Sequence, residues 1–168
     1  VLNGDLLDFD LVTAVPAQPP WPVSPTELLA GLEPTAPQSG YKLALIIAAH
    51  PGFFAALARF LVAGHQLVYV LGNHDRELCF TELREQFVEA LRQHAAASGA
   101  VLPEDKLSIE PWFFHVPGEL YAEHGHQFDY YTSFKNQLEP TVDSSEGPII
   151  ALPMGNLSNR YLMTRMGF

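Results

Sequence analysis

The sequence predicts an α/β fold, and the stretch around residue 70 is the main reason. Leu67–Leu71 is a run of apolar residues, rich in β-branched and aromatic types, which is typical of a short strand buried on both faces. A helical pattern over 51–63 precedes this strand and another over 81–98 follows it, which is the alternation of a βαβ unit. Gly72 then lets the backbone turn, and polar residues follow at the strand end where open α/β sheets place their ligand sites.

A proline-rich stretch over 10–40 follows the first strand end and turn of the chain. Within it the pattern predicts one short helix over 25–31, because Ser24 can cap this helix and Glu27 completes a capping box. We interpret 10–40 as a surface insertion. The alternative is that Trp21 covers the mouth of a substrate site, since long loops often serve as lids.

The middle of the chain predicts two helices, over 51–63 and 81–98. The segment 43–50 fits a helix or a strand equally well, because a short apolar run does not distinguish them. Thr81 is placed to cap the second helix, and Gly99 follows its end.

Further strands are predicted in the second half of the chain. Leu107–Ile109 is a short strand, and 112–116 and 119–123 are predicted to form a hairpin around Pro117-Gly118. The second strand of this hairpin leads directly into His124.

The pattern weakens toward the end of the chain. We expect a loop over 143–148 and a short amphipathic helix over 159–166, with Leu162 and Met166 on its apolar face. The whole segment 135–168 is expected to be either a lid over the substrate or a packed insertion, and we prefer the insertion.

Length, charge and cysteine usage narrow the class of protein. A chain of 168 residues with 48% hydrophobic residues is expected to form one domain. The net charge of −10 disfavours a nucleic-acid surface and simple attraction to anionic membranes. No apolar run is long enough for a transmembrane segment. Cys79 has no partner for an internal disulfide, so we expect a cytoplasmic protein.

Polar residues follow three of the predicted strand ends. They are Asp5 and Asp8 after the first, Asn73, His74, Asp75 and Arg76 after the second, and His124 and His126 after the third. Oxygen and imidazole ligands from three separate loops are typical of one metal site. Mixed His, Asp and Asn ligands suit Mn, Fe, Co or Zn.

These motifs resemble those of the calcineurin-like metallophosphoesterases. Gly4-Asp5-Leu6-Leu7-Asp8 is similar to the family's G-D-x-x-D motif, Gly72-Asn73-His74-Asp75 to its G-N-H-[DE] motif, and His124-Gly125-His126 to its isolated histidine motif. The family's opening D-x-H and closing G-H-x-H motifs do not occur in the chain. The resemblance implies a β-sandwich flanked by helices, an α/β/β/α fold, and a partial catalytic domain over 1–168 that is truncated at both ends.

The resemblance also implies a role for each motif residue at a centre of two divalent metal ions. Asp5 bridges the two ions, and Asn73 and His124 bind one of them. His74 protonates the leaving group, with Asp8 as the carboxylate that orients it. Three further residues are expected to play supporting roles. Asp75 supports the ligands, Arg76 contacts substrate phosphate, and His126 is a supporting or structural residue rather than a ligand.

The activity implied is hydrolysis of a phosphate mono- or diester, on a phosphorylated small molecule or a lipid-linked substrate. The family's bacterial UDP-diacylglucosamine hydrolases carry Arg where His74 stands, so that activity is disfavoured. The alternative is a non-catalytic scaffold or binding module of the same fold, and a third reading is a mononuclear hydrolase. If the site is real, Asp5, Asn73 and His124 must converge on one point.

Overall fold

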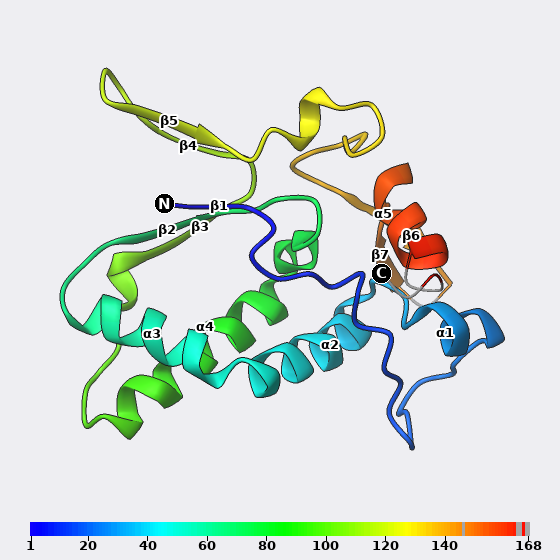
Figure 1. The fold of residues 1–168 in the computed structure, drawn as a ribbon, viewed down its shortest axis with the longest axis horizontal. Helices are drawn as coiled ribbons and strands as arrows, with labels where there is room; N and C mark the ends of the chain where they lie inside the picture. The colour runs from blue at the N-terminus through cyan, green and yellow to red at the C-terminus, as the bar shows by residue number, and fades with distance from the viewer. Residues whose placement is uncertain (146, 164–165, 167–168) are drawn as a thin grey trace.

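The computed structural model describes residues 1–145, 147–163 and 166, and it has a mixed helix-and-sheet architecture (Figure 1). Its central sheet is parallel, with strands β1 (Leu2–Asn3), β2 (Leu67–Val70) and β3 (Leu107–Glu110) in the order β1-β2-β3. Leu2 pairs with Tyr69, and Leu67 pairs with Leu107. The predicted α/β class is therefore confirmed, including the βαβ unit around β2.

Three helices cover one face of this sheet (Figure 1). They are α2 (Ala36–Ala49), α3 (Pro51–Val62) and α4 (Thr81–Ala97). The core lies between the helices and the sheet, where Phe54 of α3, Tyr69 of β2 and Phe87 of α4 are fully buried and their rings pack together. All four residues of β2 are buried, as the continuous apolar run predicts.

Smaller elements lie at the edges of this core. They are the helix α1 (Pro25–Ala30), the hairpins β4 (Phe113–Val116) with β5 (Leu120–Glu123) and β6 (Thr141–Ser144) with β7 (Gly147–Ile150), the helix α5 (Met154–Ser158) continued by a π-helical segment (Asn159–Met163), and 3-10 turns at Arg76–Cys79, Glu104–Lys106 and His126–Phe128. Figure 1 places α1, α5 and the β6–β7 hairpin together, away from the β4–β5 hairpin.

Local signals in the sequence predict several of these elements correctly. The capping box of α1 is present, with Ser24 accepting from the Glu27 N–H and Glu27 accepting from the Ser24 N–H. The helix α3 begins at Pro51, and β4 pairs with β5 in antiparallel register. The undecided segment 43–50 is helical up to Ala49, where α2 ends, and α2 begins inside the predicted insertion because Thr35 caps it.

Three local predictions are wrong. Thr81 is the first residue of α4 and caps nothing, because the N-cap position falls on Phe80. Most of the predicted loop at 143–148 is the β6–β7 hairpin, whose strands meet through Asp143–Pro148 and Ser144–Gly147 pairs. Short strands of mixed polarity lack the alternation from which a strand is recognised.

The third wrong prediction concerns the face of the C-terminal helix. Leu162 is 57% exposed and Met166 is 59% exposed, whereas Arg160 is 1% exposed. The segment therefore packs through a polar side chain, and its apolar residues face outward.

The described residues include no single helix long and apolar enough to cross a membrane. Only α2 and α3 taken together reach that length and composition, and they are bent by 86° at their junction.

Candidate functional site

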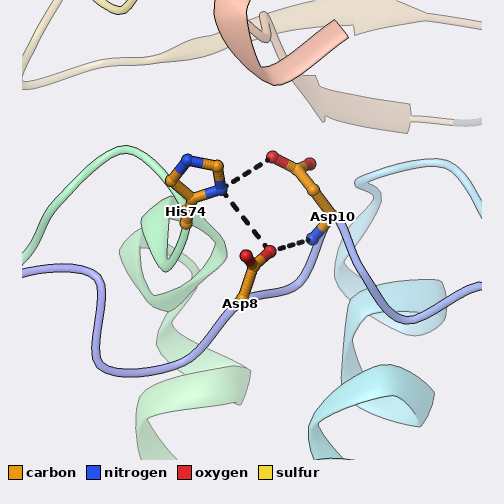
Figure 2. A group of neighbouring side chains, drawn as sticks. All are labelled: Asp8, Asp10 and His74. Atoms are coloured by element: carbon orange, nitrogen blue, oxygen red, sulfur yellow. Dashed lines mark hydrogen bonds and ion pairs between the residues drawn. The ribbon is translucent and has the colours of Figure 1, made fainter. Parts of the chain in front are cut away.

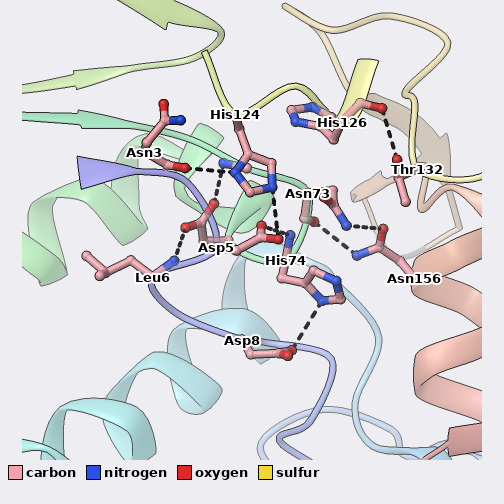
Figure 3. Close-up of polar contacts among 12 residues, drawn as sticks. Asn3, Asp5, Leu6, Asp8, Asn73, His74, His124, His126, Thr132 and Asn156 are labelled. Atoms are coloured by element: carbon pink, nitrogen blue, oxygen red, sulfur yellow. Dashed lines mark hydrogen bonds and ion pairs between the residues drawn. The ribbon is translucent and has the colours of Figure 1, made fainter. Parts of the chain in front are cut away.

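The strand ends bring the predicted site residues together at one edge of the sheet (Figure 3). Because β1 and β2 are parallel neighbours, with Asn3 paired to Val70, the segments that follow them leave the sheet side by side. Asp5 follows β1, and its Oδ1 accepts a hydrogen bond from the His74 backbone N–H at 2.9 Å. His124 follows β5 of the β4–β5 hairpin, and its ring contacts the Asp5 carboxylate (Figure 3).

Asp5 and His124 form the centre of the site. Asp5 Oδ2 lies 3.0 Å from His124 Nε2, and His124 Nδ1 lies 2.8 Å from the Asn3 carbonyl oxygen. The carbonyl accepts a hydrogen bond from Nδ1–H, and the Asp5 carboxylate can accept one only if Nε2 also carries a proton, so the contact favours the doubly protonated ring. Burial alone raises the pKa of Asp5, but the hydrogen bonds with His124 and His74 outweigh burial and lower it. The contact with Asp5 raises the pKa of His124.

Two glycines make room for this pair. A Cβ on Gly72 would lie 2.6 Å from the Asp5 backbone nitrogen and still closer to the Asp5 carboxylate. A Cβ on Gly4, where φ is +79°, would collide with the His124 ring. Gly72 itself has no positive φ, so the reason for glycine there is space and not the turn that the sequence suggests. Asp5 has φ of 51°, a strained conformation for a residue with a side chain.

Asp75 holds the two loops against each other. Its carboxylate is fully buried and accepts from the Gly72 N–H at 2.6 Å, from the Leu6 N–H at 2.9 Å and from the Tyr69 hydroxyl. Burial raises the pKa of Asp75 despite these hydrogen bonds. The contacts join the loop after β1 to the loop after β2.

His74 lies against two carboxylates (Figure 2). Its Nδ1 is 3.4 Å from Asp8 Oδ1, the expected partner, and 3.2 Å from Asp10 Oδ2. The Nδ1 atom is buried and meets hydrogen-bond geometry to neither oxygen, so these are ion-pair contacts. Asp10 first, and then Asp8, raise the pKa of His74 from 6.5 to about 10, against the opposing effect of burial. The ring is therefore an imidazolium at neutral pH.

Asn73 is joined to this group through Asn156 of α5 (Figure 3). Asn73 Nδ2 donates to Asn156 Oδ1 at 3.1 Å. Asn156 Nδ2 donates to Asp10 Oδ2 at 2.6 Å and to the Asn73 carbonyl at 3.0 Å. Asn156 is fully buried, and Asn73 is 4% exposed.

Two further charged residues, Lys42 and Glu77, are buried and interact electrostatically with Asp10. Lys42 is 1% exposed, and its Nζ donates to the Phe9 carbonyl at 3.2 Å. Burial raises the pKa of Glu77 to about 8, with Asp10 adding to the rise and Lys42 opposing it. The same burial lowers the pKa of Lys42.

Arg76 and His126 are both hydrogen-bonded to other groups of the protein. The Arg76 guanidinium is fully buried, donates to the carbonyls of Pro111 and Gln137, and lies over the Phe134 ring. This placement favours a structural role for Arg76 over the phosphate contact that the sequence suggests. His126 Nε2 lies 3.1 Å from Gln137 Oε1, and burial lowers the pKa of His126. His126 is thus engaged by a side chain of the protein.

Two sets of residues could hold a cation. Asp5, Asn73 and His124 combine carboxylate, amide and imidazole donors, and the Nδ1–H of His124 on a backbone carbonyl is the usual support of a metal-binding histidine. In the metal-free structure the Asp5 and His124 donor atoms lie 3.0 Å apart, which is the distance of a hydrogen bond. Asp8, Asp10 and His74 form a second set, with ligand atoms within 4.8 Å of one another.

An apolar cavity of about 800 Å³ runs along the loop that carries Asp8. Loop residues 6–8 and 11–14 form one wall, and the junction of α2 with α3, including Ile46, His50 and Phe53, forms the other. Asp8 is the one carboxylate among its lining residues.

Two residues of the site are absent from the sequence-based prediction. Asp10 follows Asp8 by two residues and falls at the start of the proline-rich stretch, so the strand-end pattern gives it no role. Asn156 lies 83 residues after Asn73 in a segment without a clear pattern. A single amide in such a segment gives no signal in the sequence.

No protein-family model, no curated protein and no solved structure matches this chain. Its function must therefore be inferred from its own residues.

Proposed function

We propose that the protein is a metal-dependent phosphoesterase that hydrolyses a phosphate mono- or diester at a dinuclear metal centre. The observation that carries this proposal is the assembly of Asp5 and the Asn73-His74 pair, from the ends of the parallel strands β1 and β2, with His124, from the end of the β4–β5 hairpin. The ligand positions and the histidine held by carboxylates belong to one polar cluster (Figure 3). The α/β/β/α sandwich is part of the same proposal.

In this proposal Asp5, Asn73 and His124 would hold divalent Mn, Fe, Zn or Co, and Asp5 would be a ligand of both ions of a dinuclear centre. The bound ions would supply an activated water and relief of negative charge on the phosphate. Both functions suit a protein with a net charge of −10, because the charge of the chain alone repels a phosphate.

His74 is the proposed general acid. Its Nδ1 faces Asp8 and Asp10, so Nε2 is the nitrogen that can reach a leaving oxygen. The carboxylates keep the ring protonated at neutral pH, which is the state needed to donate a proton and not to accept one. Asp8 and Asp10 thus orient the ring and hold its proton.

The substrate proposed is a phosphorylated small molecule or a lipid-linked phosphate ester. A cavity with an apolar lining next to Asp8 supports a substrate with an apolar part.

A non-catalytic scaffold is the second candidate, and one observation favours it. The Asp5–His124 pair and the His74 contacts with Asp8 and Asp10 already satisfy much of the charge of the site within the protein. Charge pairing within the protein is all that a non-catalytic binding module requires of these residues.

Metal content and turnover, measured together in the full-length protein with Mn²⁺, separate the two candidates. The enzyme proposal expects hydrolysis of phosphomonoesters or phosphodiesters. His74→Asn is expected to keep the metal and to slow turnover by about 10² to 10⁴. The loss should shrink for a nitrophenyl ester, because nitrophenolate leaves without protonation. Asp5→Asn should instead lower the metal content, because it removes a bridging charge.

His115→Asn is the matched control, because His115 is an exposed histidine on the β4–β5 hairpin. It should change neither metal content nor rate. If the wild-type protein binds no metal and hydrolyses neither ester class, the scaffold is the correct reading. If His74→Asn removes the metal and the leaving-group dependence is unchanged, His74 is a ligand and not the acid.

A further inference from the structure

We propose that Asn156 is a positioning residue that sets both the ligand oxygen of Asn73 and the carboxylate behind His74. This inference rests on the proposed function, because it explains how the ligand and the acid of that site are held. One fully buried amide contacts both of them, and it comes from α5, in the segment that the sequence leaves as a lid or an insertion.

The chemistry of its neighbours determines which way the Asn156 amide points. Asp10 Oδ2 and the Asn73 carbonyl oxygen both face the same Asn156 atom, at 2.6 and 3.0 Å. A carboxylate and a carbonyl can only accept hydrogen bonds, so the atom between them must be the donor Nδ2. The Asn156 oxygen is then left on the other side, where it can only accept.

This orientation determines the orientation of Asn73. Asn156 Oδ1 needs a donor, and the Asn73 side chain provides one through Nδ2 at 3.1 Å. The Asn73 Oδ1 is therefore turned away from Asn156. A flipped Asn73 would place two amide oxygens against each other in a site where Asn73 is 4% exposed and water cannot relieve the repulsion. Asn156 thus keeps a neutral oxygen of Asn73 available for a divalent cation.

The second contact of Asn156 acts on the acid. The Asp10 oxygen that accepts from Asn156 is also the oxygen 3.2 Å from His74 Nδ1. Asp10 is 3% exposed, so Asn156 replaces water as the donor that holds this oxygen in place. A displacement of Asn156 should therefore affect the ligand and the acid together.

The position of Asn156 is itself determined by the packing of α5. The Gly155 N–H donates to the Tyr131 carbonyl at 2.7 Å, and a Cβ on Gly155 would meet Tyr131 and Thr132 at 3.1 Å. Thr132 in turn donates to the His126 carbonyl at 2.9 Å. The C-terminal segment is thereby connected to the loop that follows His124, and it contributes a residue to the site.

The test uses Asn156→Asp and Asn156→Ala in the full-length protein, with Asn159→Asp as the control. Asn156→Asp keeps the shape and replaces the donor by an acceptor against Asp10. Asn156→Ala removes both contacts without adding charge, which provides a second variant if the buried charge prevents folding. Asn159→Asp makes the same chemical change three residues further along, at a half-buried position outside this hydrogen-bond group.

The first readout is the side-chain amide of Asn73 in NMR spectra of the metal-free protein. In the wild type its hydrogens should exchange slowly with water, and in both Asn156 variants they should exchange fast and shift. The second readout is Mn²⁺ binding, for which the dissociation constant should rise by about 10- to 100-fold, as for other residues that hold a metal ligand. The third is turnover, where the loss should be larger for a poor leaving group than for nitrophenolate.

Unchanged Asn73 amide signals and a Mn²⁺ dissociation constant within twofold of the Asn159→Asp control, together with a lower unfolding temperature, would show that Asn156 only stabilises the fold. A wild-type protein that binds Mn²⁺ but hydrolyses no ester contradicts the proposed function alone. In that case the NMR and Mn²⁺ readouts still support the role of Asn156. A wild-type protein that binds no Mn²⁺ overturns both proposals.

Discussion

Asp5 follows β1 and Gly72 follows the neighbouring parallel strand β2, and the geometry of the site depends on how closely these two residues approach each other. Asp5 adopts φ of 51°, which turns its carboxylate back toward the His74 N–H and the His124 ring. The conformation is tolerated because the Asp75 carboxylate, buried below, accepts hydrogen bonds from the N–H groups of both Leu6 and Gly72. The strain at Asp5 thus lies where the proposed bridging ligand is needed.

Gly72→Ala is expected to destabilise the protein and to weaken metal binding. The added Cβ would lie 2.6 Å from the Asp5 nitrogen, and backbone cannot yield cheaply at such a contact. We expect a loss of about 1–3 kcal/mol in the free energy of unfolding, as for other overpacked sites. The measurements are urea unfolding of the metal-free protein and Mn²⁺ titration of the folded protein.

Gly52→Ala is the control for this substitution, because a Cβ on Gly52 of α3 meets nothing within 4 Å. It should cost no stability and leave Mn²⁺ binding unchanged. Equal behaviour of the two variants would mean that Asp5 and Gly72 are not held as closely as the structure shows.

At the scale of the elements, Ser24 and Thr81 both have the residue type of a helix N-cap, but only Ser24 makes a capping hydrogen bond. Ser24 and Glu27 form a reciprocal capping box at the start of α1. Thr81 has the residue type of a cap, but it is the first residue of α4 and makes no capping hydrogen bond. The two positions therefore look alike in the sequence and differ in the structure.

Ser24→Ala should lower the free energy of unfolding by about 1 kcal/mol, because the Glu27 N–H loses its acceptor at the start of α1. Thr81→Ala should change it by less than about 0.5 kcal/mol, as for an exposed position without a special contact. Urea unfolding of both variants against the wild type checks the difference. Equal losses at the two positions would contradict the assignment of the cap to Ser24.

At the scale of the whole molecule, the buried side chain of Arg160 connects two segments that are far apart in the sequence. Arg160 is 1% exposed and donates to the carbonyls of Ala30 and Gly31 at 3.3 and 2.6 Å. It also pairs with Glu33 at 3.3 Å. These contacts join the C-terminal segment to the end of α1, which Figure 1 shows on the same side of the molecule as α5.

Arg160→Met should therefore loosen the C-terminal segment. The variant leaves buried carbonyls without donors, and we expect a loss of about 3 kcal/mol in the free energy of unfolding. Protease cleavage within 154–163 should become faster. Arg59→Met, at an exposed position in the last turn of α3, should change neither. An Arg160 variant as stable and as resistant to protease as the Arg59 variant would show that this connection does not hold the segment.

The sequence by itself determines the central part of this protein. The buried run at β2, the proline at the start of α3 and the capping box of α1 are local signals, and each corresponds to an element in the structure. Parallel pairing brings neighbouring strand ends to one edge, so the proximity of Asp5 to the loop after β2 also follows from the sequence. The pairing of Asp8 with His74 is likewise expected and observed.

Only the tertiary structure shows which buried polar residues hold these side chains in place. Asp10, Asn156 and Arg160 are polar residues in segments that lack a clear pattern, and each is buried with a hydrogen-bond partner that lies more than a hundred residues away in the chain. Polar burial depends on such distant partners, whereas apolar periodicity is a property of adjacent residues. For this reason the sequence predicts which strand ends lie close together, and only the folded chain shows which buried polar groups hold them.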